Sequence, residues 1–193
     1  MRRSAMWGLA AVALASAAAV AGEGLRWELG FKHATPTWAK IQVSADKTAV
    51  AWYMAYDVEN KTGAARKPAV RCEIRTDTKK TFSDNADPLV IAAAKRALDV
   101  KEIATAADLK KGIEDGAKVK CVATFGAVDD EAKKLELRVY GLMDPVTMVK
   151  GKEVFEVKYW QVIYERKGDE FGRTEDPWKT VSSGWKTEEE TKK

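Results

Sequence analysis

Alternation of apolar and polar residues with a period of two constrains this chain more than any other feature. The pattern is strongest in "AVAWYMAYDVEN" (49–60), where Trp52, Met54, Tyr56 and Val58 share one face. Successive side chains of a strand point to opposite faces, so the pattern predicts a β-strand. Aromatic side chains bury large areas and suit a pleated surface, so we interpret this face as core. The alternative is a face that lines a ligand site.

The same alternation predicts further strands throughout the chain. They cover residues 25–31, 38–44, 69–76, 117–126, 134–142 and 151–166, with a last short strand ending near Trp185. The segment 151–166 is apolar on both faces in places, so it is expected to bend or to lie under another element. Gly, Asn, Asp and Pro mark the turns, as antiparallel strands require. The prediction is a mainly β fold, an immunoglobulin-like antiparallel β-sandwich. Antibody-domain spacing is not found, because Trp52 precedes both cysteines.

One stretch departs from this β pattern. In "DPLVIAAAKRALDV" (87–100), Asp87 is a candidate N-cap and Pro88 occupies the first helical position. Good helix formers follow. Thr105 and Asp108 have the spacing of a capping box, which predicts a second short turn. A short helical insertion around 87–111 is therefore expected between two strands.

The two ends of the chain are expected to lie outside the folded domain. Arg2 and Arg3 precede a small-to-apolar run, and Ala19-Val20-Ala21 fits the small-x-small cleavage rule. Residues 1–21 are therefore predicted to be a signal peptide, with Gly22 the first residue of the mature protein. An uncleaved anchor is the alternative, which the short, Ala-rich run disfavours. The predicted domain is 22–185, and 186–193 is a charged tail predicted to be disordered.

Charge and composition narrow the class of partner. Cleavage removes two arginines and no acidic residue, which lowers the formal net charge from +4 to +2. Basic and acidic residues are interspersed, which describes a solvated surface and not the basic stripe of a nucleic-acid binder. We expect a periplasmic or secreted protein with no nucleic-acid partner and no stable membrane span after signal cleavage. Its partner is predicted to be a protein or another envelope component.

Export bears on the two cysteines, Cys72 and Cys121. Each lies in a predicted strand and shares a face with apolar residues. An oxidising compartment permits a disulfide, and two cysteines allow a single pairing. We predict that this bond forms. The alternative is two buried free thiols, which pack as small hydrophobes.

Few residues suggest catalysis. The single histidine, His33, cannot build a zinc site and is interpreted as a surface-loop residue before a proline. The acidic stretches "SDNAD" (83–87) and "VDDEA" (128–132) offer oxygen ligands for calcium, but they lack the alternating spacing of a calcium loop. Turn formation and helix capping account for both. "NKT" (60–62) fits the N-glycosylation sequon and is interpreted as a turn. No catalytic residues, metal site or cofactor is predicted.

A charge-rich stretch near the C-terminus is the candidate partner-binding site. "YERKGDEFG" (164–172) ends a predicted strand, and "EDPW" (175–178) follows it. Aromatic side chains flanked by charge can anchor partners, so a recognition loop is considered there. Its candidate residues are Tyr164, Arg166, Asp169 and Trp178. The alternative is a solvated turn.

Four stretches resemble a loose group of uncharacterised exported bacterial proteins that have a single immunoglobulin-like domain. They are "WYMAYDVENKTG", "RTDTKKTFSD", "FGAVDDEAKKLELRVYGL" and "YERKGDEF", within residues 45–172. These motifs specify turns and strand pairing. The resemblance implies the fold and the exported location, and it implies no activity.

Two functions follow as hypotheses. The first is an exported, non-enzymatic binding or structural module that acts through a surface or its loops. The second is a hydrolase or other envelope enzyme that uses carboxylates such as Asp129 and Asp130. A concave pocket with two convergent carboxylates would favour the enzyme.

Overall fold

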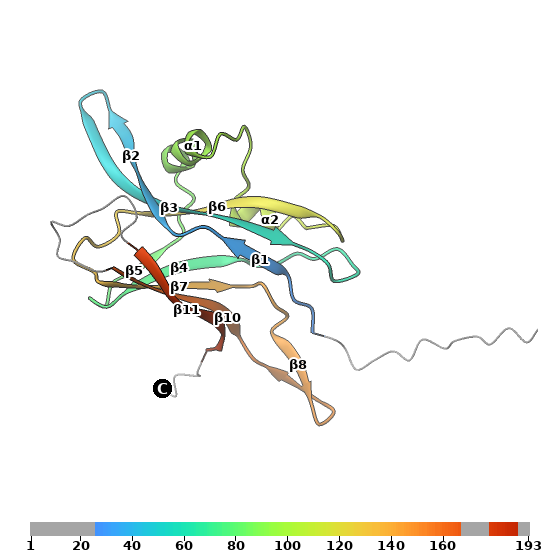
Figure 1. Cartoon of the computed structure of the whole chain (residues 1–193). Helices are drawn as coiled ribbons and strands as arrows, with labels where there is room; N and C mark the ends of the chain where they lie inside the picture. Colours follow the sequence, from blue (N-terminus) through green and yellow to red (C-terminus); the bar gives the residue numbers. More distant parts are fainter. Residues whose placement is uncertain (1–25, 167–177, 189–193) are drawn as a thin grey trace, which may run out of the picture.

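A computed structural model describes residues 26–166 and 178–188 (Figure 1). Two antiparallel sheets contain most of the strands, and a separate two-stranded hairpin extends from them. In chain order the elements are β1 (Gly30–His33), β2 (Thr37–Ser44), β3 (Lys47–Glu59), β4 (Arg71–Thr76), β5 (Thr81–Ser83), α1 (Pro88–Ala97), α2 (Ala106–Leu109), β6 (Lys118–Gly126), β7 (Lys134–Tyr140), β8 (Val146–Val149), β9 (Lys152–Phe155), β10 (Lys158–Arg166) and β11 (Trp178–Thr187).

The long strand β3 organises the four-stranded sheet. β6 pairs along one edge of β3, while β2 and β1 share the other edge in succession. β2 pairs with the first half of β3, and β1 pairs with the second half. The five-stranded sheet has the order β11-β10-β7-β4-β5. The fold is therefore mainly β, as the alternation predicted, and the two sheets are consistent with a β-sandwich.

The main hydrophobic core lies between the two sheets. Trp52, Met54, Tyr56 and Val58 are all buried there, which confirms that this face of β3 is core. Leu135, Leu137 and Val139 of β7 belong to the same cluster, which joins the second sheet to the first. Burying such side chains stabilises a fold by roughly 1.5–3 kcal/mol each.

A second core lies on the other face of the four-stranded sheet. Helix α1 covers this face in Figure 1, and its Val90, Ala93 and Ala94 are buried against Ile41 and Tyr53 of the β2–β3 hairpin. β3 is thus covered on both faces along residues 51–54, where four successive side chains are buried. The helical insertion supplies the cover that this sheet face lacks.

The helix starts follow the predicted caps. Asp87 accepts hydrogen bonds from the backbone N–H groups of Leu89 (2.8 Å) and Val90 (3.4 Å), and Pro88 is the first residue of α1. Asp108 accepts from the Thr105 backbone N–H at 3.0 Å. Side-chain caps satisfy donors that have no partner inside a helix, so these residues fix where the insertion begins.

The structure also departs from the strand predictions. The stretch 151–166 is two strands, β9 and β10, which separate at residues 156–157. The short strands β5 and β8 were not predicted. β11 includes Lys186 and Thr187, two residues of the predicted tail, and residues 189–193 lie outside the described part.

The predicted disulfide is not present among the described residues. Cys72 of β4 and Cys121 of β6 are both free thiols, fully buried in the main core. Burial raises the pKa of Cys72 well above its usual value and that of Cys121 to about 12. The thiols therefore stay protonated and pack as small hydrophobes, which was the alternative interpretation. The Cys121 thiol donates a weak hydrogen bond to the Val119 carbonyl, 3.6 Å away.

Candidate functional site

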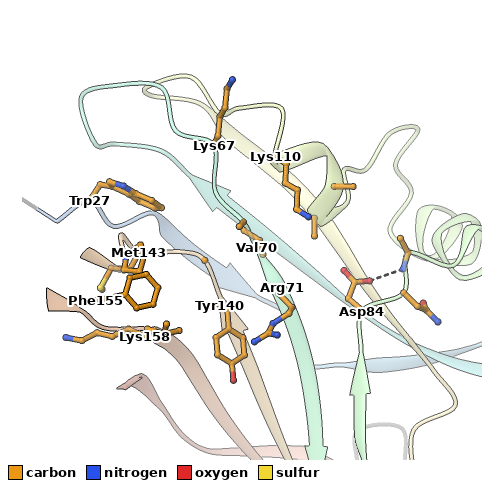
Figure 2. Close-up of a pocket in the computed structure, with 18 residues that line it drawn as sticks. Trp27, Lys67, Val70, Arg71, Asp84, Lys110, Tyr140, Met143, Phe155 and Lys158 are labelled. Carbon is orange, nitrogen blue, oxygen red and sulfur yellow. Dashed lines mark hydrogen bonds between the residues drawn. The ribbon is translucent and has the colours of Figure 1, made fainter. Parts of the chain in front are cut away.

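A cleft of about 750 Å³ lies where the β8–β9 hairpin leaves the sandwich (Figure 2). Five chain segments line it: the strand-like stretch before β1, the entry to β4, the loop after β5, helix α2, and the residues from the end of β7 to the start of β10. Its volume falls in the range of small-molecule sites. The lining residues are Trp27, Lys67, Ala69, Val70, Arg71, Asp84, Asn85, Ala86, Ala106, Ala107, Lys110, Tyr140, Gly141, Met143, Pro145, Phe155, Val157 and Lys158.

Gly141 allows the backbone at one side of the cleft to approach closely. It has φ +76°, and a Cβ atom at this position would overlap the Ala69 carbonyl. Glycine adopts positive φ without steric cost, so it fits both requirements here. The end of β7 can therefore lie directly against the entry to β4.

The apolar wall consists of side chains near the hairpin base. Figure 2 shows Trp27, Met143 and Phe155 gathered on one side of the cleft. The backbone of Trp27 accepts a hydrogen bond from the Asp144 N–H at 3.0 Å, which holds this stretch against residues 142–144. Val157 adds a further apolar surface.

The cleft has an excess of positive charge. Four of its lining residues are basic, Lys67, Arg71, Lys110 and Lys158, and one is acidic, Asp84. Figure 2 shows Arg71 beside Tyr140 and the Lys110 side chain reaching inward, while the ends of Lys67 and Lys158 point outward. The summed charge favours an anion.

The central cations differ in how they are held. The Arg71 guanidinium lies 4.3 Å from the Tyr140 ring centroid, a cation–π contact, and its Nε is 3.5 Å from Glu73. Lys110 forms no ion pair with any described residue. The Arg71 guanidinium is thus held in position before a ligand binds. The Lys110 ammonium is not paired with an acidic side chain of the described residues.

Asp84 has a structural role in the cleft wall. Its Oδ1 accepts from the backbone N–H groups of Thr124 (3.0 Å) and Ala86 (3.1 Å). Asn85 accepts from the Thr124 hydroxyl at 2.6 Å. The "SDNAD" stretch therefore fixes a turn and caps α1, as predicted.

The structure places the candidate partner-binding residues largely in the interior. Tyr164 is fully buried, and its hydroxyl lies 3.1 Å from His33 Nδ1. Trp178 is 5% exposed and meets Trp52 edge-on at 6.2 Å. Arg166 covers the Trp178 ring at 5.2 Å and donates to the Asp130 carbonyl. These aromatics belong to the main core, because β11 pairs with β10 and places Trp178 in the cluster between the sheets. Asp169 lies outside the described residues.

His33 is not a surface-loop residue. It ends β1, is half-buried, and stacks on Phe31 at 5.4 Å between ring centroids. Burial lowers its pKa below the usual value. The neutral ring is therefore the form that fits beside Tyr164.

The second acidic stretch also forms a turn. Asp129 pairs with Lys80 at 3.0 Å and accepts from the Thr78 hydroxyl and the Glu131 N–H. These contacts lower the pKa of its carboxyl. No cluster of three metal-ligating side chains occurs within 26–166 and 178–188. Asp129 is engaged in holding its turn and lies outside the cleft.

Asn60, in the sequon, is a buried turn residue. Its Nδ2 donates to the carbonyls of Ile113 (2.8 Å) and Ala64 (2.9 Å), and its Oδ1 accepts from the Thr62 N–H at 3.1 Å. These bonds tie the loop after β3 to the loop before β6. The side chain has no exposed surface, so the turn interpretation is confirmed.

The cleft itself was not found from the sequence. Its basic residues are scattered from Lys67 to Lys158, each in a stretch without a motif. The one local signal is a glycine directly after a strand, at Gly141.

No protein-family model, curated protein or solved structure matches this chain. Among the described residues, no helix is long and apolar enough to cross a membrane.

Proposed function

We propose that this chain is an exported, non-enzymatic binding protein of immunoglobulin-like fold whose cleft holds an amphipathic anion. The observation that carries the proposal is the pairing, in one cleft, of an apolar wall with cationic residues. Trp27, Met143 and Phe155 supply the wall, and Arg71 and Lys110 supply the inward charge. Ligand sites are typically apolar pockets with a few convergent polar groups.

The two ends of the ligand occupy two different parts of the cleft. Its anionic head, a phosphate or carboxylate, lies between Arg71 and Lys110, because a guanidinium binds such groups through two N–H donors. Its apolar body lies against Trp27 and Phe155, where burial removes exposed surface from water. Phe155 is 70% exposed, so a bound ligand can bury much of its apolar surface.

The lining favours binding over conversion of the ligand. Within the described residues that line the cleft there is no histidine, cysteine or serine, and Asp84 is bonded to two backbone N–H groups. Asp129, named in the enzyme hypothesis, is paired with Lys80 elsewhere. Two convergent carboxylates are not among the cleft residues, so no observation favours a hydrolase.

Isothermal titration calorimetry with three probes tests the proposal. Dodecyl phosphate, kept below its critical micelle concentration, is expected to bind, whereas dodecyltrimethylammonium and inorganic phosphate bind at least tenfold more weakly. Arg71→Gln and Lys110→Gln are each expected to weaken dodecyl phosphate about tenfold, which corresponds to about 1.4 kcal/mol.

Lys47→Gln is the matched control, because Lys47 is an exposed residue at the start of β3 and does not line the cleft. It should bind like the wild type. Equal binding of the cationic and anionic probes, or equal loss in the control, would contradict the proposal. Recovery of a mature N-terminus at Gly22 from the envelope or medium tests export separately.

A further inference from the structure

The β8–β9 hairpin concentrates the exposed hydrophobic surface of the molecule. Ten large hydrophobic residues are exposed in the described part of the chain, and five of them lie in these two short strands. They are Val146, Met148, Val149, Val154 and Phe155, with exposed fractions from 39% to 70%. Figure 1 shows the hairpin extending away from both sheets. Exposed apolar groups gathered in this way mark an interaction site.

Both faces of this ribbon are apolar. The strand register places Val146 opposite Phe155, with Met148 on that same face, and it places Val154 on the other face together with Val149. The hairpin forms a sheet of its own, separate from the other two. A two-stranded hairpin is marginally stable in water, so an environment that covers both faces would stabilise this one.

The base of the hairpin is fixed to the sandwich. Arg26 donates to the Asp144 carbonyl, to the Glu156 carbonyl at 2.7 Å and to the Glu156 carboxylate at 3.0 Å. The Glu156 N–H donates to the Pro145 carbonyl at 2.7 Å. Residues 144–145 and 156 are thereby held together, so the exposed strands leave the domain in a defined direction.

Unpaired positive charge lies at the turn end of the ribbon. Lys150 (φ +51°) and Gly151 (φ +74°) form a tight turn of the kind that joins hairpin strands, and Lys152 follows. Neither Lys150 nor Lys152 forms an ion pair with a described residue, and both are exposed. Lys158 lies just beyond the base, where its ammonium pairs with the Glu156 carboxylate at 3.4 Å. Glu153 is the one acidic residue of the two strands, and it is exposed as well.

We propose that the β8–β9 hairpin docks on an anionic lipid bilayer and lies in its interfacial layer. A protein groove would cover one face of the ribbon and leave the other in water, whereas lipid surrounds both. Lys150 and Lys152, at the turn, meet the phosphate headgroups, and their alkyl stems lie along the apolar layer. Four residues per strand span about 13 Å, too short to cross a hydrocarbon core of about 30 Å. A second copy of the chain would bury too little area through so short a ribbon to form a stable dimer.

Vesicle flotation tests the docking. The tested chain is the predicted mature protein, residues 22–193, which lacks the apolar run 1–21, and circular dichroism checks that it is folded. This chain is expected to float with vesicles of phosphatidylglycerol and phosphatidylcholine in a molar ratio of about 30:70. It is expected to bind vesicles of pure phosphatidylcholine at least tenfold more weakly. Met148→Ser with Val154→Ser, one change on each face, should reduce binding at least tenfold, and so should Lys150→Glu with Lys152→Glu.

Two controls keep the outcome decisive. Val181→Ser replaces an exposed valine of β11, 57% exposed, and should bind like the wild type. Arg71→Gln, in the cleft, should also retain vesicle binding, so loss of the proposed ligand site and loss of docking are told apart. Circular dichroism checks that each variant is folded. Val149→Trp, on the face of the ribbon away from Phe155 and outside the cleft, reports insertion when brominated lipid quenches its emission beyond the quenching seen for the wild type.

The proposal is overturned if the wild type does not float with the anionic vesicles, or binds neutral vesicles as well. It is also overturned if the folded hairpin variants float like the wild type, or if the added emission of Val149→Trp is not quenched.

Discussion

Two hairpins extend beyond the sandwich, and they differ in what covers them. The β2–β3 hairpin has helix α1 packed on one face, where Ile41 and Tyr53 meet Val90. The β8–β9 hairpin has no helix on either face within the described residues, and its apolar side chains are exposed. The chain uses an insertion between β5 and β6 to cover one face of the first hairpin. The second retains its apolar surface, which is the expected condition of a surface that contacts something else.

The largest expected effect comes from a charge placed in helix α1, which covers the first hairpin, and it is compared with a charge placed on the exposed second hairpin. Val90→Asp would bury a carboxylate with no partner and should reduce the free energy of unfolding by about 4 kcal/mol or prevent folding. Val154→Asp, on the uncovered hairpin, should change it by less than about 0.5 kcal/mol. Urea unfolding measures both.

Val90→Ala separates the effect of a buried charge from the effect of lost packing on the free energy of unfolding. It creates a cavity without a charge, so a smaller loss of about 2 kcal/mol is expected. Equal destabilisation by Val90→Asp and Val154→Asp would show that the second hairpin is also covered, and the comparison would be wrong.

A medium effect is expected at the base of the uncovered hairpin. Arg26→Ala removes the donor that joins Asp144 to Glu156. A charge-assisted hydrogen bond contributes about 1.5–3 kcal/mol, so the local opening of β8–β9 should become about tenfold or more easier. Hydrogen exchange of the β8 and β9 amides measures this opening.

The β2 and β3 amides are the internal reference, since the side-chain hydrogen bonds of Arg26 within the described residues go to Asp144 and Glu156. Arg96→Ala, at an exposed position of α1, is the matched control. Faster exchange across the whole molecule would mean that Arg26 supports the sandwich rather than the hairpin.

The covered regions were the easier ones to predict from sequence. Alternation placed Trp52, Met54 and Tyr56 on an inner face because burial on one side of a strand imposes a period of two. Asp87 and Pro88 marked the start of α1 through local hydrogen bonding and a fixed φ. Both signals act within a few residues, so they can be recognised without a structure.

The uncovered hairpin and the cleft beside it depend on distant contacts. The break between β9 and β10 occurs at Glu156, which Arg26 holds from 130 residues away, and no local pattern records that bond. Trp178 was considered for a recognition loop, because its flanking charges are visible in sequence and its contact with Trp52 is not. Lys110 and Arg71 are far apart in sequence, and only the folded positions of α2 and β4 bring both residues to the cleft.

A smaller effect is expected for the two core thiols. Cys72→Ala, at a fully buried site, should reduce the free energy of unfolding by about 1–2 kcal/mol through lost packing. In the folded wild type both thiols should react very slowly with Ellman's reagent, because burial raises the pKa of each. In denaturant, without reductant, two thiols per chain should react. Failure of both to react after unfolding would show that the bond forms in the isolated protein.

The smallest effect concerns His33, the last residue of β1, which pairs with the second half of β3. Its pKa is lowered by burial, so between its folded and unfolded values the unfolded chain binds more protons. Stability is therefore complete above the unfolded value of about 6.5 and is lost as the pH falls below it. Because the ring is half-buried, the loss from pH 7.5 to 5.5 should be below about 1 kcal/mol.

Urea unfolding of the wild type and His33→Gln at both pH values isolates this contribution, since the other titrating groups are shared. A wild type that gains stability relative to His33→Gln at pH 5.5 would mean that Tyr164 and its surroundings favour the charged ring, and that this edge of the core is more open to water than its packing against Phe31 indicates.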